Sequence, residues 1–472
     1  MELKNIHTFY FIGIGGIGMS ALARYFNAAG NKIYGYDKTA TKLTDELISE
    51  GIDIHFEDDV KYISEHFETF KRNELLIVYT PAIPKNFGEF VYFKEHQFEL
   101  MKRSELLGLI TQKSYTIAVA GTHGKTTTSS LIAHILKTAN IDCTAFLGGI
   151  TQNYNTNLLL SENLKSENKL ATKKSIVVVE ADEYDRSFLT LHPNVAVITS
   201  VDADHLDIYG DANEMEESYS LFANQINAEG VLITKKNVQE KISYSKRTLT
   251  YSVNEKSNYY TKNNSIENGF YKYDIVCPDE VIENVTLGIQ GHHNVENSVA
   301  AVAAVRQLNV NANDIKKSLN TFKGVKRRFE YIIKTKKLIF IDDYAHHPEE
   351  LKACINSVKA IYPNKKITGV FQPHLFSRTR DFADEFAKSL SLLDEVILLE
   401  IYPARELPIE GVTSKMLLNK IKVAEKNIFS KEEIINEIEK RKPEVLLTLG
   451  AGDIDALVEP IKNRLQKINC ES

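Results

Sequence analysis

The stretch that most restricts the possible fold is "IAVAGTHGKTTTSS", residues 117–130. An apolar run leads into a Gly-Thr-His-Gly loop, a lysine and three consecutive threonines, and a helical pattern follows at once. Strand, glycine loop and helix in this order form a cradle for phosphate, because backbone N–H groups at the helix start surround the anion and a lysine neutralises it. The sequence therefore predicts an α/β fold with an ATP site at residues 121–125, which we call the lysine loop.

A second glycine-rich stretch, "FIGIGGIG", stands between another strand pattern and another helix pattern. Its residues 13–18 are called the N-terminal glycine loop below. Gly13, Gly15 and Gly18 fit the GxGxxG fingerprint, and Asp37 ends the next strand where a ribose-binding carboxylate is expected. The fingerprint predicts a bound diphosphate, but it does not separate a nicotinamide cofactor from another diphosphate ligand.

Strand and helix patterns alternate along the chain, which predicts three α/β domains. We expect an N-terminal Rossmann-like parallel sheet, a central P-loop ATPase domain with an antiparallel flank, and a C-terminal Rossmann-like domain, over residues 1–112, 113–323 and 324–472. The stretch "FKGVKRRFE" at the last boundary contains Gly324, which is the candidate hinge.

Three local patterns refine this expectation. Residues 241–289 carry alternating aromatic residues and the dipeptide Asn268-Gly269, which predict the antiparallel flank. Residues 98–114 have a helical pattern, and the polar stretch 161–174 is predicted to be a surface loop. Pro348 is suited to the first turn of a helix that carries an apolar face.

Charge, hydropathy and cysteine content indicate which partners and which compartment suit the chain. Its formal net charge of -6 provides no general attraction to nucleic acid, and no apolar run approaches the length of a membrane span. The 4 cysteines form no CxxC pair, so neither a disulfide framework nor a zinc site is expected. We expect a cytoplasmic protein that acts on small molecules as a monomer or weak homodimer, without a nucleic-acid partner or membrane insertion.

Two residues at predicted strand ends are candidate metal ligands. Glu180 ends the run "IVVVE", and His205 follows the next predicted strand. The carboxyl ends of parallel strands lie beside the phosphate loop, so we expect both side chains near the γ-phosphate, with the Thr126 hydroxyl. For each residue alone, the alternative is an ordinary solvated side chain.

Motifs along nearly the whole chain resemble those of the Mur ligase family. In order they are "GIGGIGMS", "GTHGKTTT", "EADEYDRSF", "DHLDIYG", "GHHNVENSVAA", "RRFE", "DDYAHHP", "QPHLFSRTRD" and "GAGD". The resemblance implies that the N-terminal glycine loop binds a UDP-sugar and the lysine loop binds ATP. It further implies that ATP, with Mg²⁺ or Mn²⁺, phosphorylates the lactyl carboxylate of UDP-N-acetylmuramate, and that the amine of L-alanine attacks the acyl phosphate.

The motifs and the resemblance together assign candidate residues to each ligand. The UDP-sugar candidates are Gly13, Gly15, Gly16, Gly18, Asp37 and Thr80. The ATP candidates are Gly121, Thr122, His123, Gly124, Lys125, Thr126, Thr127, Asn294, Asn297, Arg328 and Asp343. The L-alanine candidates are His346, His374, Arg378 and Arg380. The candidate metal ligands are Thr126, Glu180 and His205, and the candidate catalytic residues are Lys125, Glu180, His205, His346 and Arg378.

Several alternatives stay open at this point. The alternative for Asn294 and Asn297 is a role as helix caps or polar surface residues. The alternative for "RTRD" is the capped start of a helix. Some Mur ligases hold a second metal with a carbamoylated lysine, but no lysine occurs between Leu206 and Thr234, which leaves Glu216, Glu217 or water and substrate. The rival functions are a recycling ligase that adds a preformed peptide, an NAD-dependent oxidoreductase and a non-catalytic nucleotide switch.

Overall fold

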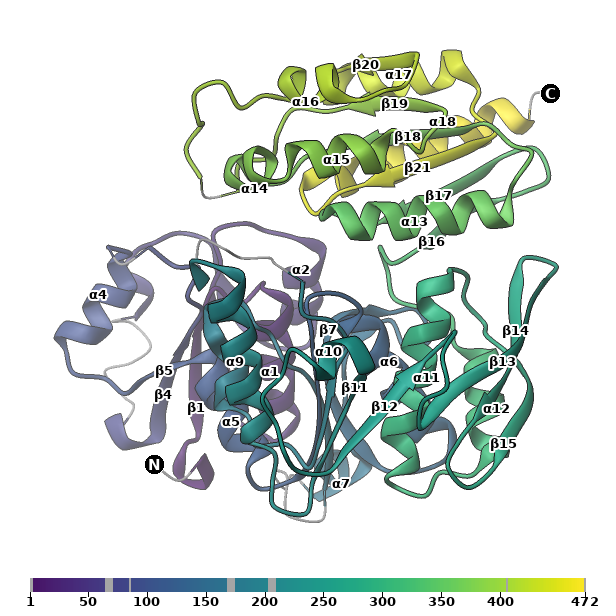
Figure 1. Ribbon diagram of the computed structural model, residues 1–472. Helices are drawn as coiled ribbons and strands as arrows, with labels where there is room; N and C mark the ends of the chain where they lie inside the picture. Colours follow the sequence, from purple (N-terminus) through teal and green to yellow (C-terminus); the bar gives the residue numbers. More distant parts are fainter. Residues whose placement is uncertain are drawn as a thin grey trace. The chain divides into compact units, whose positions relative to one another are not determined.

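The computed structural model in Figure 1 describes residues 3–63, 71–84, 86–167, 175–202, 209–404 and 406–470. It confirms the α/β class, with sheets of five, ten and six strands. The chain forms two compact units, of which the first contains 1–264, 273–286 and 296–323 and the second contains 265–272, 287–295 and 324–472. The N-terminal sheet and most of the central sheet belong to the first unit, while residues 265–272 at the β13–β14 turn are assigned to the second. The three-domain division stays a prediction.

The N-terminal sheet has the strand order β3-β2-β1-β4-β5. All its strands are parallel: β1 (Thr8–Ile12), β2 (Lys32–Tyr36), β3 (Asp53–His55), β4 (Leu75–Tyr79) and β5 (Leu100–Lys102). Its helices are α1 (Ile17–Ala28), α2 (Lys42–Ser49), α4 (Gly88–Glu95) and α5 (Arg103–Thr111). Phe9 and Phe11 pack with α1 and α5 in one core, whereas Tyr10 and Ile12 pack with Phe93 of α4 in another. Alternation along β1 therefore places helices on both faces of the sheet.

The predicted helix over 98–114 is wrong at its start. Residues 100–102 form β5, which pairs parallel with β4, and the helix begins only at Arg103. Pairing with β4 overrides the local helical pattern, because backbone hydrogen bonds to a neighbouring strand are not visible in local propensity.

The central sheet has the order β15-β14-β13-β12-β11-β10-β6-β9-β7-β8. Its strands are β6 (Tyr115–Ala120), β7 (Cys143–Thr151), β8 (Thr156–Leu159), β9 (Ile176–Glu180), β10 (Val195–Ile198), β11 (Val231–Lys235), β12 (Thr248–Ser252), β13 (Tyr259–Glu267), β14 (Phe270–Val276) and β15 (Val281–Thr286). Its helices are α6 (Lys125–Thr138), α7 (Glu162–Glu167), α9 (Ala212–Asn224), α10 (Lys236–Gln239), α11 (His292–Arg306) and α12 (Ala312–Thr321). The predicted helix after the lysine loop is confirmed as α6.

Two local predictions need correction in the central part of the chain. Within 241–289, β12 pairs parallel with both β11 and β13, so this part of the flank is not antiparallel. The Asn268-Gly269 turn does join neighbouring strands β13 and β14, and both residues have positive φ, 53° and 80°. The first part of the predicted loop 161–174 is helix α7, anchored by buried Leu164, while 168–174 lies outside the described residues.

The C-terminal sheet has the order β16-β17-β21-β18-β19-β20, with β16 antiparallel at one edge and parallel pairing elsewhere. Its strands are β16 (Glu330–Lys334), β17 (Ile339–Asp343), β18 (Ile367–Phe371), β19 (Glu395–Leu398), β20 (Glu425–Ile428) and β21 (Val445–Leu449). Its helices are α13 (Pro348–Ile361), α14 (Phe376–Asp381), α15 (Ala383–Leu390), α16 (Ser414–Lys420), α17 (Lys431–Arg441) and α18 (Val458–Cys470). Helices α13 and α15 cover one face and α17 and α18 the other (Figure 1).

A single hydrophobic core joins the N-terminal and central sheets. It contains Phe9 and Phe11 of β1 together with Ala118 and Ala120 of β6. The side chain of Arg24 in α1 also reaches β8, where its Nη1 donates to Asn157 Oδ1 at 2.7 Å. The two glycine loops, which follow β1 and β6, are thus supported by one packed interior.

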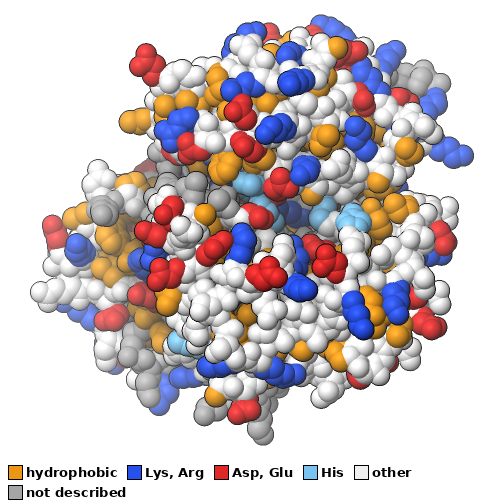
Figure 2. All heavy atoms as spheres, in the orientation of Figure 1, with side chains coloured by type: hydrophobic (Ala, Val, Ile, Leu, Met, Phe, Trp, Pro, Cys, Tyr) orange, Lys and Arg blue, Asp and Glu red, His pale blue; other side chains and the backbone are white. Residues whose placement is uncertain are grey.

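Charged side chains of both signs are interspersed on the face that Figure 2 shows. No helix within the described ranges combines the length and the apolar composition that crossing a membrane requires. The described cysteines, Cys143, Cys277 and Cys354, are free thiols, and all three are buried.

Candidate active site

The lysine loop has a backbone that requires glycine at two positions. Gly121 and Gly124 have φ values of 127° and 83°. A β-carbon on Gly124 would lie 2.5 Å from Asn297 Oδ1, and one on Gly121 would lie 2.1 Å from Thr199 Oγ1. Both the left-handed backbone and the close neighbours therefore exclude a side chain, which lets the loop backbone approach a phosphate closely.

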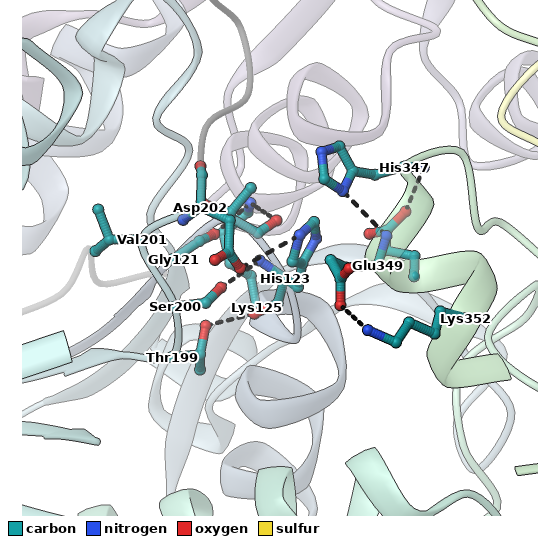
Figure 3. A network of polar contacts seen from close by, with 12 residues as sticks. Gly121, His123, Lys125, Thr199, Ser200, Val201, Asp202, His347, Glu349 and Lys352 are labelled. Atoms are coloured by element: carbon teal, nitrogen blue, oxygen red, sulfur yellow. Dashed lines mark hydrogen bonds and ion pairs between the residues drawn. The ribbon is translucent and has the colours of Figure 1, made fainter. Parts of the chain in front are cut away.

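The loop is held against the segment that follows β10, as Figure 3 shows. His123 N donates to Ser200 Oγ at 2.9 Å, and Thr122 Oγ1 donates to Asp202 O at 3.0 Å. Thr199 Oγ1 donates to the carbonyl of His123, whose Nε2 lies 3.6 Å from Asp202 Oδ2. The conformation of the lysine loop is therefore fixed by contacts within the protein, to residues 199–202.

Lys125 is the cation of the loop and is surrounded by oxygen atoms. Its Nζ donates to Gly121 O at 2.6 Å and Thr122 O at 3.2 Å, and to Glu183 Oε1 at 2.8 Å. Burial opposes the charged ammonium, but the carboxylates of Glu183 and Glu180 more than offset this effect and hold the pKa of Lys125 above its ordinary value. The side chain is therefore a permanent positive charge, and a phosphate oxygen would replace at least one of its three acceptors.

Glu183 was not among the predicted site residues. It is only 2% exposed, its Oε2 has no hydrogen-bond partner among the described residues, and its carbonyl accepts from the Tyr209 hydroxyl at 2.6 Å. Burial raises the pKa of Glu183 to about 7, although Lys125 acts in the opposite direction. The run of acids in "EADEYD" is the sequence signal for this residue, but the strand-end pattern points to Glu180 and not to Glu183.

Glu180 ends β9, which is the neighbour of β6, the strand that leads into the lysine loop. Its Oε2 accepts from Gly148 N at 3.2 Å, and a β-carbon on Gly148 would lie 2.2 Å from the Glu180 carboxylate oxygens. Together with the nearer carboxylate of Glu183, it helps to hold the pKa of Lys125 above its ordinary value. Glu180 therefore ends the strand beside the one that leads into the lysine loop, and its role as a metal ligand stays a prediction.

The residues at this position were tested for their fit to Mg²⁺. The Glu180 carboxylate and the Thr126 hydroxyl, in the first turn of α6, are hard oxygen donors of the kind that Mg²⁺ prefers. Within the described ranges, no group of three or more His, Cys, Asp and Glu side chains forms a metal site, and His205 lies outside those ranges. The donors present fit a Mg²⁺ ion that keeps water and phosphate ligands, and the ligand set stays a prediction.

The N-terminal glycine loop is held by Asp37 and Thr80. Gly13 has a φ of 86°, and a β-carbon on it would lie 2.7 Å from Thr80 Cγ2. Asp37 Oδ2 accepts from Gly15 N at 2.8 Å. In this structure Asp37 therefore orders the loop backbone, and a contact to a ribose stays a prediction.

A pocket of about 240 Å³ opens between the N-terminal glycine loop and the end of β9. It is lined by Gly16, Ile17, Gly18, Met19, Ala21, Leu22, Thr80, Arg103, Leu107, Phe146, Leu147, Gly148, Glu180 and Asp182. Of the predicted UDP-sugar residues, Gly16, Gly18 and Thr80 reach this pocket, and Glu180 is shared with the lysine-loop site. Sequence reasoning did not find Arg103 or Asp182.

The predicted L-alanine residues all belong to the second unit, which contains the C-terminal sheet. The rings of His346 and His374 are 6.1 Å apart, and His374 stacks on Tyr402 at 5.7 Å. Arg378 is buried in the short helix α14. Arg380 is 55% exposed and its Nε donates to Asp381 Oδ1 at 2.7 Å. The structure brings the two histidines together, whereas Arg380 is a surface side chain.

Two further ATP candidates belong to the same unit. Asp343 is buried and accepts from Phe329 N at 2.7 Å and from Ala345 N at 2.8 Å. Burial raises the pKa of Asp343 to about 6, against the opposing effect of Arg328. The Arg328 guanidinium lies 4.9 Å from the centre of the Tyr344 ring. The carboxylate of Asp343 thus orders local backbone in this structure.

The remaining candidates are asparagines of α11 and the acids of α9. Asn294 and Asn297 are both buried, so neither is a surface residue. Asn297 Oδ1 faces Gly124 of the lysine loop, and its contact with ATP stays a prediction. Glu216 pairs with Lys241 at 3.1 Å, and Glu217 is exposed.

Comparison with known families decides the membership of this chain. Residues 8–115 match the model of the Mur ligase family, catalytic domain, residues 119–305 match the Mur ligase middle domain, and residues 327–452 match the Mur ligase, glutamate ligase domain. The chain belongs to the Mur ligase family.

Full-length relatives and solved structures agree with this membership. The chain is 49% identical to UDP-N-acetylmuramate--L-alanine ligase of Parabacteroides distasonis, covering 99% of each, and 48% identical to that of Flavobacterium psychrophilum, covering 99% and 100%. The UDP-N-acetylmuramate-alanine ligase MurC of Thermotoga maritima is 27% identical, with a TM-score of 0.77 over 98% and 99% of the chains. A murein peptide ligase of Psychrobacter arcticus, at 21% identity and a TM-score of 0.73 over 97% and 98%, shares the fold.

Proposed function

We propose that this chain is an ATP-dependent ligase that joins L-alanine to the lactyl carboxylate of UDP-N-acetylmuramate. The products are the amide, ADP and phosphate, and the reaction belongs to the synthesis of peptidoglycan precursors in the cytoplasm. One observation carries the proposal: the pocket at the N-terminal glycine loop is lined by Glu180, which ends β9, the strand that pairs with β6 and so lies beside the start of the lysine loop. A sugar-nucleotide site and a nucleotide triphosphate site would thus share one carboxylate.

The chemistry requires activation of the carboxylate, because its oxygen is a poor leaving group. Transfer of the γ-phosphoryl group makes an acyl phosphate, which the alanine amine attacks to form the amide and release phosphate. Phosphoryl transfer between two anions depends chiefly on alignment and on charge neutralisation. Lys125 and the loop N–H groups would neutralise the phosphates, and Thr126 and Glu180 would hold Mg²⁺. When bound, Mg²⁺ supplies further neutralisation of the charge that moves in the transition state.

The C-terminal unit would supply the amino acid. Arg378 is the candidate for the alanine carboxylate, since a guanidinium can bind both oxygens of a carboxylate. His346 and His374, whose rings are 6.1 Å apart, would lie at the amine end. Arg380 is the weaker candidate, because its side chain is exposed and already bonded to its neighbour Asp381.

A recycling ligase that attaches a preformed peptide is the second candidate within the family. The murein peptide ligase of Psychrobacter arcticus shares the fold, at 21% identity. The 49% identity to an alanine ligase over 99% of the chain favours L-alanine. An oxidoreductase is disfavoured because the pocket at the N-terminal glycine loop is shared with Glu180 of the ATP-site strand.

A phosphate-release assay with a substrate panel tests the proposal. UDP-N-acetylmuramate, ATP and Mg²⁺ are held constant while L-alanine, L-serine, glycine and a tripeptide that begins with L-alanine are compared. We expect release with L-alanine at the highest kcat/KM, and formation of the matching amide by mass spectrometry. Turnover with the tripeptide but not with L-alanine would assign the recycling reaction instead. Absence of turnover with every acceptor, together with nicotinamide binding, would assign an oxidoreductase.

A further inference from the structure

Arg103 places a guanidinium in the pocket beside the N-terminal glycine loop. It is the first residue of α5 and directly follows β5, which the helical pattern of residues 98–114 did not predict. Its position is therefore set by the pairing of β5 in the sheet. A β-carbon on Gly18 would lie 2.6 Å from Arg103 Nη1, which puts the guanidinium against the first turn of α1. Among the described residues that line the pocket, it is the only Lys or Arg side chain.

The guanidinium keeps most of its donors available. Arg103 Nη2 donates to Asp182 Oδ2 at 3.0 Å, and no other hydrogen bond of its side chain occurs among the described residues. A guanidinium has five N–H donors in a planar fork that fits phosphate oxygens. The side chain is 17% exposed, so it is largely fixed by its surroundings while one side faces the pocket.

The charges of the pocket make this cation necessary for an anionic ligand. The lining includes two carboxylates, Glu180 and Asp182. A sugar nucleotide brings two negative charges on its diphosphate, which these carboxylates repel. The N–H groups at the start of α1 offset only part of that repulsion, since a helix terminus amounts to about half a unit charge.

We propose that Arg103 is a substrate-binding residue that contacts the diphosphate of the sugar nucleotide, and that Asp182 orients its guanidinium. The inference rests on the proposed function, because it assumes the sugar nucleotide as the ligand of this pocket. Affinity for the sugar nucleotide would then come from Arg103, at the start of α5, as well as from the glycines and Thr80. Asp182 would have a positioning role.

The neighbouring cation provides a matched control. Lys102 also bridges the N-terminal and central sheets, since its Nζ lies 2.9 Å from Asp185 Oδ2. It is 40% exposed and does not belong to the pocket lining. Its removal takes away one positive charge and one ion pair at the same junction, but it leaves the pocket unchanged.

Calorimetric titration of the full chain with UDP-N-acetylmuramate, without ATP, tests the inference. We expect Arg103→Ala to lower the affinity about 10- to 100-fold, as for loss of hydrogen bonds to a charged group. Arg103→Lys should lie between Arg103→Ala and the wild type, because it keeps the charge but loses the fork. Lys102→Ala should stay within threefold of the wild type, and all variants should bind ADP with wild-type affinity.

The outcomes separate this inference from the proposed function. If the wild type binds UDP-N-acetylmuramate and Arg103→Ala binds it within threefold, the inference alone is overturned. An equal loss in Lys102→Ala also overturns it, because the effect would then come from loosening the junction. If the folded wild type fails to bind the sugar nucleotide at all, the proposed function falls, and the inference falls with it.

Discussion

At the scale of single residues, the positive charge of Lys125 is balanced by Glu183 inside the protein. Lys125→Ala removes the cation that would meet the ATP phosphates, so we expect ligation to be lost. The affinity for UDP-N-acetylmuramate should stay near that of the wild type, because Lys125 does not line that pocket, whose cation is Arg103. Calorimetry measures this affinity, and circular dichroism checks that the variant is folded. A collapse of sugar-nucleotide affinity in a folded variant would refute the separation of the two sites.

Glu180 offers a second test at this scale. Glu180→Gln keeps the size of the side chain but removes the charge that a Mg²⁺ ion needs, so the loss should fall on kcat. We expect a decrease on the order of a hundredfold, about 3 kcal/mol, with partial recovery at high Mg²⁺. Glu240→Gln, at an exposed position, is the control and should turn over normally. Normal turnover of Glu180→Gln at ordinary Mg²⁺ would exclude the metal assignment.

At the scale of elements, the turn from β6 into α6 depends on the backbone of Gly124. Gly124→Ala forces an alanine to a φ of 83° and places its β-carbon 2.5 Å from Asn297 Oδ1. Gly51→Ala imposes a φ of 88° but meets nothing within 4 Å, so it isolates the backbone cost. We expect thermal unfolding to show about 1 kcal/mol of destabilisation for Gly51→Ala and more for Gly124→Ala. Only Gly124→Ala should lose ATP binding, and equal effects of both variants would contradict the steric argument.

His134 of α6 links this helix to α12 and gives the fold a pH dependence. Its ring nitrogens lie 2.8 Å from Tyr154 Oη and 3.0 Å from Thr321 Oγ1. Burial lowers the pKa of His134 from 6.5 to about 4, so the folded state holds the neutral ring. Stability is therefore lost as the pH falls from 6.5 towards 4, by roughly 1.4 kcal/mol per pH unit.

Urea unfolding of His134→Gln over that pH range measures the effect. The variant should lose this part of the slope, because glutamine does not titrate. His96→Gln removes an exposed histidine and should keep the wild-type slope. Parallel slopes for the wild type and His134→Gln would show that His134 titrates alike in the folded and unfolded chains.

At the scale of the whole molecule, the candidate residues for ATP and for L-alanine are divided between the two units. We therefore predict that the units approach each other when substrates bind, with Gly324, at a φ of 91°, as the hinge. Small-angle scattering should show a smaller radius of gyration with an ATP analogue and UDP-N-acetylmuramate together than with either alone. An unchanged radius of gyration under saturation by both ligands would contradict this prediction.

Features that depend on residues close together in the chain are predictable without the structure. The helix after the lysine loop, the buried face of α13 and the Asn268-Gly269 turn follow from periodicity and turn chemistry within a few residues. The position of Glu180 was also predictable, because a strand end beside a parallel neighbour has a known place in an α/β sheet.

Contacts between distant segments, by contrast, become visible only in the folded chain. The partners Lys125 and Glu183 are 58 positions apart, and Arg103 and Asp182 are 79 apart, so no local pattern pairs them. Strands β5 and β12 likewise owe their existence or direction to the strand beside them. Hydrogen bonds and ion pairs between distant segments form only once the chain has folded, and local propensity contains no record of which segments will meet.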